Sequence, residues 1–295
     1  MGTTKRERQK EGRQARIEAE AAAQVAANRR RTIIRGAVAV VVILIGVFIY
    51  SLVSSDDDAN TLATDATQTD DSVADETADD STGGTAPELD ADGNTPCPAV
   101  EGQERFITFE GPMANCLEDG ASYTVVFATT EGDVTVELDH DLTPNTTNNF
   151  VALTRYGYYD GTELFRTDPS IAIIQGGGPH TNSASDPGPG YNIPDEGGEF
   201  SDDNGSYTGP FTYQPGQLVM ARSAGPDSSG AQFFFTVGQE SALLDAQGTY
   251  LHFGDVVGGM SILEAILDLH QADDSGLGGR PSRPVIIESI TIEQS

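Results

Sequence analysis

An uncharged apolar segment between a basic and an acidic region constrains this chain most. It covers Gly36–Ser55, reads GAVAVVVILIGVFIYSLVSS, and is dominated by Val, Ile, Leu and Phe. At a rise of about 1.5 Å per residue it would form a helix of about 30 Å, which matches the hydrocarbon thickness of a bilayer. A cleaved signal peptide and a buried core helix are the alternatives, but no small-residue cleavage motif follows Tyr50. The segment therefore predicts an uncleaved transmembrane anchor at residues 36–55.

The charges that flank this segment predict its orientation. The tail, residues 1–35, holds ten basic and four acidic residues, whereas Asp56–Asp58 lies on the other side. Basic residues stay on the cytoplasmic side of a membrane helix. We therefore expect a single-pass cell-membrane protein with a cytoplasmic N-terminus and everything after Ser55 outside the cytoplasm.

The part of the chain after residue 35 is strongly acidic. Of the 16 basic and 46 acidic residues in the chain, it keeps six basic and 42 acidic ones, which gives a formal charge of −36. Such a body repels phosphate backbones, so nucleic acid is excluded as a partner. Residues 56–95 are mostly Asp, Thr, Ala, Ser and Gly and have too few large apolar side chains to form a core. They predict a disordered acidic linker.

The only two cysteines, Cys97 and Cys116, fall in an extension at residues 96–122. Outside the cytoplasm such a pair favours a disulfide over two free thiols. Two thiols without a nearby histidine make a poor metal site, so no metal or cofactor is expected.

The segment 123–293 has the pattern of a mainly β domain. Residues 123–128 and 133–139 alternate like strands around a turn at Thr130–Gly132, and Thr143–Pro144 begins a helix that runs through Tyr156. Further short strands are expected near Leu164 and at 171–174, 218–221, 232–237, 251–256 and 285–292, with a second helix at 260–269. Residues 178–214 are expected to be a long loop. Many short strands and two helices predict a closed barrel.

A series of motifs in this segment resembles the cyclophilin family, in the membrane-anchored bacterial form that is found among actinobacteria. The motifs come in the family's order over about residues 123–292, which makes the resemblance specific. They are Tyr158-Tyr159-Asp160-Gly161, Phe165-Arg166, Gln175-Gly176-Gly177, Gly188-Pro189-Gly190-Tyr191, Met220-Ala221, Ala224-Gly225-Pro226, Gly230-Ala231-Gln232-Phe233-Phe234, Leu244-Asp245, Phe253-Gly254 and Gly259-Met260.

The resemblance implies a fold and an activity. The fold would be a closed eight-stranded antiparallel barrel capped by two α-helices, and the activity would be peptidyl-prolyl cis/trans isomerisation of exported proteins. Arg166 would stabilise the twisted prolyl amide, and Gln175 would orient its guanidinium. Phe234, Ile173 and Leu244 would line the proline pocket, and Ala221 and Gln232 would border the adjoining groove.

The chain departs from the family pattern at several wall positions. Phe165 replaces the usual histidine before the arginine, Leu243 a common tryptophan, and Tyr250 a pocket histidine. The usual pocket phenylalanine corresponds to Ala172, unless the extra residue in 167–170 moves Ile171 into its place. One additional residue also occurs at Arg222-Ser223. These changes keep the arginine but alter the pocket walls.

A peptide-binding or chaperone module of the cell envelope, with little turnover, is the alternative function. A hydrolase is disfavoured, because the four histidines lie in no recognisable nucleophile motif. The expected partners are proline-containing polypeptides and, through the anchor, the membrane. The chain itself is expected to be a monomer.

Overall fold

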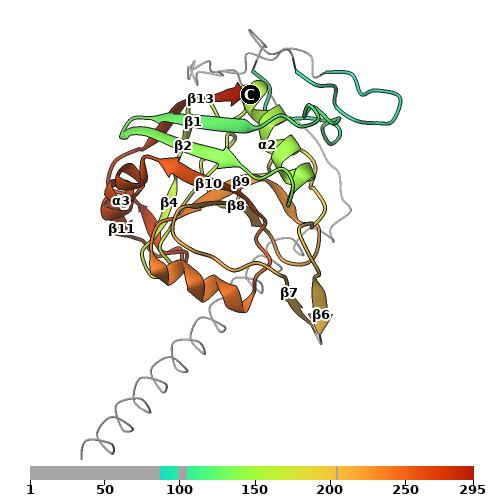
Figure 1. Ribbon diagram of the computed structural model, residues 1–295. Helices are drawn as coiled ribbons and strands as arrows, with labels where there is room; N and C mark the ends of the chain where they lie inside the picture. Colours follow the sequence, from blue (N-terminus) through green and yellow to red (C-terminus); the bar gives the residue numbers. More distant parts are fainter. Residues whose placement is uncertain (1–86, 99–104, 204) are drawn as a thin grey trace, which may run out of the picture. The chain divides into compact units, whose positions relative to one another are not determined.

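The computed structural model describes residues 87–98, 105–203 and 205–295, and in these parts eleven strands form one antiparallel sheet (Figure 1). Their order across the sheet is β11-β12-β4-β5-β9-β8-β10-β2-β1-β13-β3. The strands of this sheet are β1 (Tyr123–Thr129), β2 (Gly132–Leu138), β3 (Thr162–Glu163), β4 (Arg166–Asp168), β5 (Ile173–Gly176), β8 (Gln217–Arg222), β9 (Ser229–Thr236), β10 (His252–Gly258), β11 (His270–Ala272), β12 (Gly279–Pro281) and β13 (Ile286–Gln294).

The sheet curls into a half-barrel but does not close, so the predicted closed eight-stranded barrel is wrong in its closure and its strand number. The two edge strands of the sheet are β11 and β3, and they do not pair with each other. Strand β3 has two residues and pairs with β13, and Leu164 N–H continues this pairing by donating to Val285 O, the residue before β13. No ladder of hydrogen bonds therefore closes the described sheet.

The predicted helices are confirmed at α2 (Pro144–Arg155) and α3 (Met260–Asp268). Helix α2 begins after Thr143, as its Pro at the first turn favours. The Thr143 side chain does not cap the helix, however. The Glu196 carboxylate, far along the chain, accepts from the backbone N–H groups of Asn145 (3.1 Å) and Thr146 (2.6 Å).

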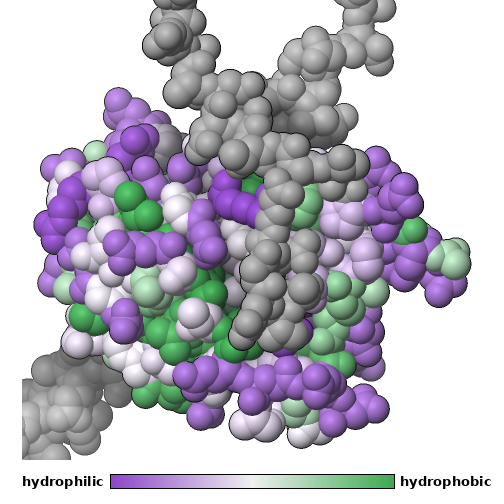
Figure 2. Space-filling model, turned by 90° about the horizontal axis from the view of Figure 1, so that it is seen from above, coloured by the Kyte–Doolittle hydropathy of each residue, from purple (hydrophilic) through white to green (hydrophobic). Residues whose placement is uncertain are grey.

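The interior of the half-barrel is filled by aromatic rings from several elements. Phe127 and Phe150 contact each other and Phe233, with ring centroids 5.5–5.9 Å apart. Phe235 and Phe253 complete this fully buried group. Rings at such spacings contribute pairing energy beyond their buried area. Figure 2 shows the outer surface as a mixture of hydrophilic and smaller apolar patches.

Five elements of the described residues, four short strands and one 3₁₀ helix, were not predicted from the sequence. Strands β6 (Ser201–Asp203) and β7 (Ser206–Thr208) form a small hairpin that projects from the body inside the expected long loop (Figure 1). The short pair β11–β12 extends the sheet edge beyond β4, and a 3₁₀ helix, η1 (Gln239–Ala246), follows β9. The hairpin turn between β1 and β2 is where it was expected, with Thr129 opposite Gly132.

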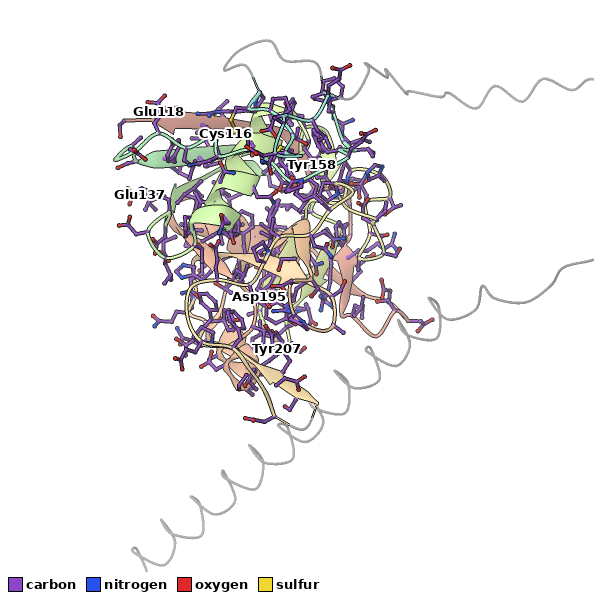
Figure 3. The ribbon with its side chains drawn as sticks, turned by 90° about the vertical axis from the view of Figure 1, so that its right-hand side faces the viewer. Cys116, Glu118, Glu137, Tyr158, Asp195 and Tyr207 are labelled. Carbon is purple, nitrogen blue, oxygen red and sulfur yellow. A yellow bond between two sulfur atoms is a disulfide. The ribbon has the colours of Figure 1, made fainter. Side chains whose placement is uncertain are left out.

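The extension before β1 is fastened to the domain by a disulfide and by backbone hydrogen bonds. Cys97 and Cys116 are bonded, as expected, and Cys116 lies close to α2 (Figure 3). Thr95 pairs with Met113, and the Tyr156 hydroxyl donates to Pro96 O at 2.7 Å. Phe109, 3% exposed, packs on the Tyr156 ring.

Several sequence predictions lie outside the described residues. These are the basic tail (1–35), the transmembrane anchor (36–55) and the acidic linker (56–95) up to residue 86. The last residues of that linker are described, and there the Asp90 carboxylate accepts from the N–H groups of Asp92 and Asn94. In the described ranges, no helix combines the length and the apolar character that crossing a bilayer requires.

Replacing both Cys97 and Cys116 by serine should lower the free energy of unfolding by about 3 kcal/mol, because the disulfide closes a loop of this size in the unfolded chain. Urea unfolding of the full chain, followed by tyrosine fluorescence, measures this loss. A reductant should have the same effect on the natural protein and none on the double variant. An unchanged unfolding midpoint would show that the bond does not stabilise the domain.

Candidate functional site

The pairing of β4, β5 and β9 places most of the predicted site residues on one face of the sheet. Arg166 lies opposite Gln175, and Gln175 lies opposite Phe234. Because side chains alternate between the two faces of a strand, Ile173 shares the face of Gln175 and Gln232 that of Phe234. Ala221 follows Val219, which pairs with Phe234, by two residues and lies where the β8–β9 register shifts, between Met220 and Arg222.

The Arg166 guanidinium is held by three acceptors from three segments. Its Nε donates to Leu277 O at 2.6 Å, Nη1 to Gln175 Oε1 at 2.8 Å, and Nη2 to Asp168 Oδ2 at 3.2 Å. A guanidinium has five N–H groups, so two remain for another molecule, one on each Nη. The side chain is 18% exposed, which leaves it accessible from one side.

Gln175 connects this arginine to β9. Its Oε1 accepts from Arg166, and its Nε2 donates to Gln232 Oε1 at 2.8 Å. Gln232 in turn donates through Nε2 to Ser183 O and Ala184 O, both at 3.4 Å. The chain of amides therefore fixes the orientation of Gln175, which is 6% exposed, and links Arg166 to the loop that carries residues 183 and 184.

An apolar wall lies next to the polar residues. The Phe234 ring meets Tyr250 edge-on, with centroids 5.3 Å apart, and Leu244 packs against the core from η1. Tyr213 holds Tyr250 by its backbone, because the Tyr213 hydroxyl accepts from Tyr250 N (2.8 Å) and donates to Tyr250 O (3.0 Å). This arrangement fixes one wall beside Phe234.

Tyr250 remains a neutral phenol over the ordinary pH range. Burial raises the pKa of its hydroxyl above the usual value, and the positive charges of Arg166 and Arg222 only partly oppose this rise. The residue therefore offers an uncharged hydrogen-bonding group near Arg166.

The structure places Ile171 and Ala172 in the turn before β5. Ala172 is 2% exposed and has a positive φ of 48°, and its carbonyl accepts from Val237 N–H. Ile171 is partly buried against the core. A left-handed turn at Ala172 thus leads into β5. Leu243, in η1, is half-buried and lies outside the core cluster that includes Leu244.

Arg222, the residue after Ala221, is held by an ion pair and by hydrogen bonds to backbone oxygens. Arg222, with a side chain 1% exposed, pairs with Asp195 at 3.0 Å and donates to the backbone oxygens of Thr249 and Gly225. Its guanidinium also lies over the Tyr207 ring, whose hydroxyl donates to Asp195 at 2.5 Å. Figure 3 labels both residues, with Asp195 above Tyr207. The unusual Arg222-Ser223 insertion therefore carries a buried ion pair.

Sequence reasoning missed two contributors to the site. Asp168 was given no role, although it follows Arg166 by two residues in one strand, the spacing that puts both side chains on one face. Leu277 contributes only its carbonyl, and no side-chain pattern reports such a contact.

The site is suited to polar and apolar recognition rather than to covalent chemistry. In the described part of the chain, no group of three His, Cys, Asp or Glu side chains is arranged to hold a metal ion. The site offers one fixed cationic donor, two ordered amides and a neutral apolar wall. Such a set can bind an extended peptide and donate hydrogen bonds to one amide.

Comparisons with known proteins point to one family. Residues 124–292 match the family model described as cyclophilin type peptidyl-prolyl cis-trans isomerase/CLD. The chain is 35% identical to the peptidyl-prolyl cis-trans isomerase cyp18 of Streptomyces antibioticus, over 57% of this chain and 98% of that one. It is 31% identical to the probable peptidyl-prolyl cis-trans isomerase B of Mycobacterium tuberculosis, over 59% and 56%.

A comparison with solved structures found a crystal structure of a cyclophilin type peptidyl-prolyl cis-trans isomerase from Cryptosporidium parvum. It is 28% identical, with a TM-score of 0.45, and the match covers 58% of this chain and 98% of that one.

Replacing Asp168 by alanine should lower the free energy of unfolding by about 1–3 kcal/mol, because the half-buried Arg166 loses a charged acceptor. Asp168→Asn keeps an acceptor oxygen and should cost less. The control is Asp141→Ala, whose side chain is 97% exposed. Chemical unfolding gives the stabilities, and the Arg166 Nε–H exchange rate in NMR should rise in Asp168→Ala. Equal stability and exchange in all three variants would contradict the role of this pair.

Proposed function

The chain belongs to the cyclophilin-type peptidyl-prolyl cis-trans isomerase family, and we propose that its domain accelerates rotation about X-Pro bonds in exported polypeptides by means of Arg166. The observation that carries this proposal is the position of Arg166. It is fixed by Gln175, Leu277 and Asp168, and it lies on the same sheet face as Phe234.

The reaction requires no nucleophile. Rotation about the prolyl bond is opposed by a barrier of about 18–20 kcal/mol, which comes from delocalisation of the nitrogen lone pair into the carbonyl. In the twisted amide this delocalisation is lost, and the nitrogen becomes a hydrogen-bond acceptor. A donor that is already in place stabilises the twisted state more than the planar one, and each 1.36 kcal/mol so gained is about tenfold in rate.

Arg166 would supply this donor through one of its two unused N–H groups. Its three internal hydrogen bonds keep the guanidinium in one orientation, so little reorganisation is needed when the amide twists. Gln175 acts as the positioning residue. The proline ring would lie against Phe234, with Tyr250 and Leu244 as neighbours, and the flanking backbone would run past Gln232 and Ala221.

A second candidate function is a peptide-binding or chaperone module with little turnover. One observation favours it: the carboxylate of Asp168 neutralises part of the charge that Arg166 could offer to the twisted amide. Measurement of turnover and binding in the same samples separates the two functions.

Arg166→Ala should lower kcat/KM for a prolyl peptide about 10²–10³-fold, as loss of a fixed donor to a developing charge does in other enzymes. Arg166→Lys should recover little, because an ammonium group cannot satisfy the same three acceptors. A coupled prolyl-peptide assay on the full chain in detergent measures the rates, and Arg155→Ala is the matched control. Isomerisation at the natural rate in Arg166→Ala would overturn the mechanism, and peptide binding without any acceleration would establish the second function.

We further propose a location and an assembly state for the protein. Residues 36–55 would anchor it once in the cell membrane, with the basic tail in the cytoplasm, the catalytic domain outside and the chain monomeric. The apolar segment and its flanking charges support this topology. The disulfide supports an oxidising compartment. Relatives from Streptomyces and Mycobacterium support an actinobacterial-like form.

The full chain should sediment with membranes, and protease added to intact cells stripped of their wall should digest the isomerase domain but leave the basic tail protected. A chain with two aspartates in place of Val42 and Leu44 should lose the membrane fraction, because charges at the centre of a span cost several kcal/mol. Fractionation and immunoblotting with tags at both ends measure this. A soluble natural chain, or a protected C-terminal tag, would contradict the topology.

A further inference from the structure

A cavity of about 420 Å³ lies beside Arg166. It is bounded by the end of β3 and the start of β4, by the loop residues Asn182–Ala184, and by the segment from Gln271 to Val285. The cavity shares Arg166 with the proposed catalytic face, and Leu277, whose carbonyl accepts from Arg166, also lines it. Phe234, Leu244 and Tyr250 do not line it. The cavity is therefore a separate compartment that adjoins the site.

The lining of this cavity concentrates the few positive charges of the domain. Only six basic residues follow residue 35, and three of them, Arg166, Arg280 and Arg283, line it. The acidic residues of the lining are Glu163 and Asp273, and two of the arginines are paired with carboxylates outside the lining, Arg166 with Asp168 and Arg283 with Glu131. The other three arginines lie elsewhere and are bound to other partners: Arg105 to Gly157 O, Arg155 to Gln294, and Arg222 to Asp195.

The three arginines of the cavity differ in how strongly they are already engaged. Arg166 makes three internal hydrogen bonds, and Arg283 forms a bidentate pair with Glu131, at 2.9 and 2.7 Å. Arg280 has a side chain that is 74% exposed, and its contact with Asp273 is 3.9 Å, beyond hydrogen-bond distance. Arg280 therefore has the planar donor set that is most available to a carboxylate.

We propose that this cavity is a subsite for an acidic side chain of the substrate, an aspartate or glutamate close in sequence to the proline. The proposal rests on the proposed function, since Arg166 must bind the prolyl amide for a neighbouring side chain to reach the cavity. Arg280 would be the specificity-determining residue, and the hydroxyl and amide groups of Asn182, Ser183 and Ser282 would supply further donors around the carboxylate.

The expected effect is modest because Arg280 is exposed. Exposed ion pairs are weak and screened by salt, so a glutamate should improve kcat/KM about threefold to fivefold over glutamine. At ordinary ionic strength, charges that are more than about 10 Å apart are largely screened, so the acidic body hardly repels an anionic peptide at long range. A preference for glutamate would therefore report a local contact and would shrink in high salt.

The test uses the full chain and prolyl peptides with one Ala-Pro core. Glutamate, glutamine or lysine is placed at each of the three positions on either side, and kcat/KM and Kd are measured for each peptide. At one or more positions glutamate should exceed glutamine threefold to fivefold. In Arg280→Gln the ratio should fall to about one, in Arg280→Lys it should partly return, and in the control Arg155→Gln it should stay unchanged.

Two results would overturn the subsite: equal values for glutamate and glutamine at every position, or a glutamate advantage that survives in Arg280→Gln. Failure of the proposed function is distinguishable, because Kd is measured separately from turnover. If no peptide is accelerated but glutamate still binds more tightly through Arg280, the subsite stands and the catalytic proposal falls. If no peptide binds, both fall.

Discussion

The register of β5 between β4 and β9 is the constraint on which the rest of the structure depends. It puts Gln175 on β5 opposite Arg166 on β4 and opposite Phe234 on β9, so that this polar residue is the neighbour of both the arginine and the phenylalanine. The same alternation turns Phe233 and Phe235 toward the aromatic core. A slip of one residue would exchange these faces, exposing the core rings and burying Gln175 and Gln232 without partners. Packing of the core therefore fixes the geometry of the site.

The N-terminal extension contributes to this geometry from outside the sheet. Phe109 N–H donates to Pro189 O at 2.8 Å, and the ring of His180 lies 3.0 Å from Ile107 O. At Gly190 an added Cβ would lie only about 2.4 Å from Phe109 O, so this contact requires glycine. The segment held in this way is the loop whose carbonyls accept from Gln232. The disulfide-linked extension thus helps to hold in place the loop that contacts Gln232.

Local signals in the sequence predicted the parts of the fold that depend on neighbouring residues. The turn between β1 and β2, the start of α2 and the positions of most strands follow from alternation, proline and glycine. Contacts between segments that are far apart in the sequence could not be predicted from such local signals. Glu196 caps α2 from about fifty residues away, and β11 and β12 pair at an edge formed by a short loop. The many short strands and two helices also suggested closure, because such a pattern shows where strands lie but not whether the edge strands of the sheet exchange hydrogen bonds.

The same difference between local signals and long-range contacts applies to the residues of the site. The motifs located Arg166, Gln175, Gln232 and Phe234, because each occupies a regular strand position with a fixed partner. They did not reveal the left-handed turn at Ala172, since alanine seldom adopts that conformation and the core around it must hold it there. Nor did they reveal Asp168, which looks like an ordinary turn residue until the strand pairing directs it toward Arg166.

The scarcity of positive charge gives each arginine a defined role. No lysine follows residue 10, and Arg166 and Arg222, with side chains 18% and 1% exposed, each meet a carboxylate and at least one backbone carbonyl. A guanidinium suits both positions, because it keeps its charge when buried and its planar donors can satisfy several acceptors at once. An ammonium group would satisfy fewer of them. In a part of the chain whose formal charge is −36, Arg166 and Arg222 are two fixed cations that donate hydrogen bonds.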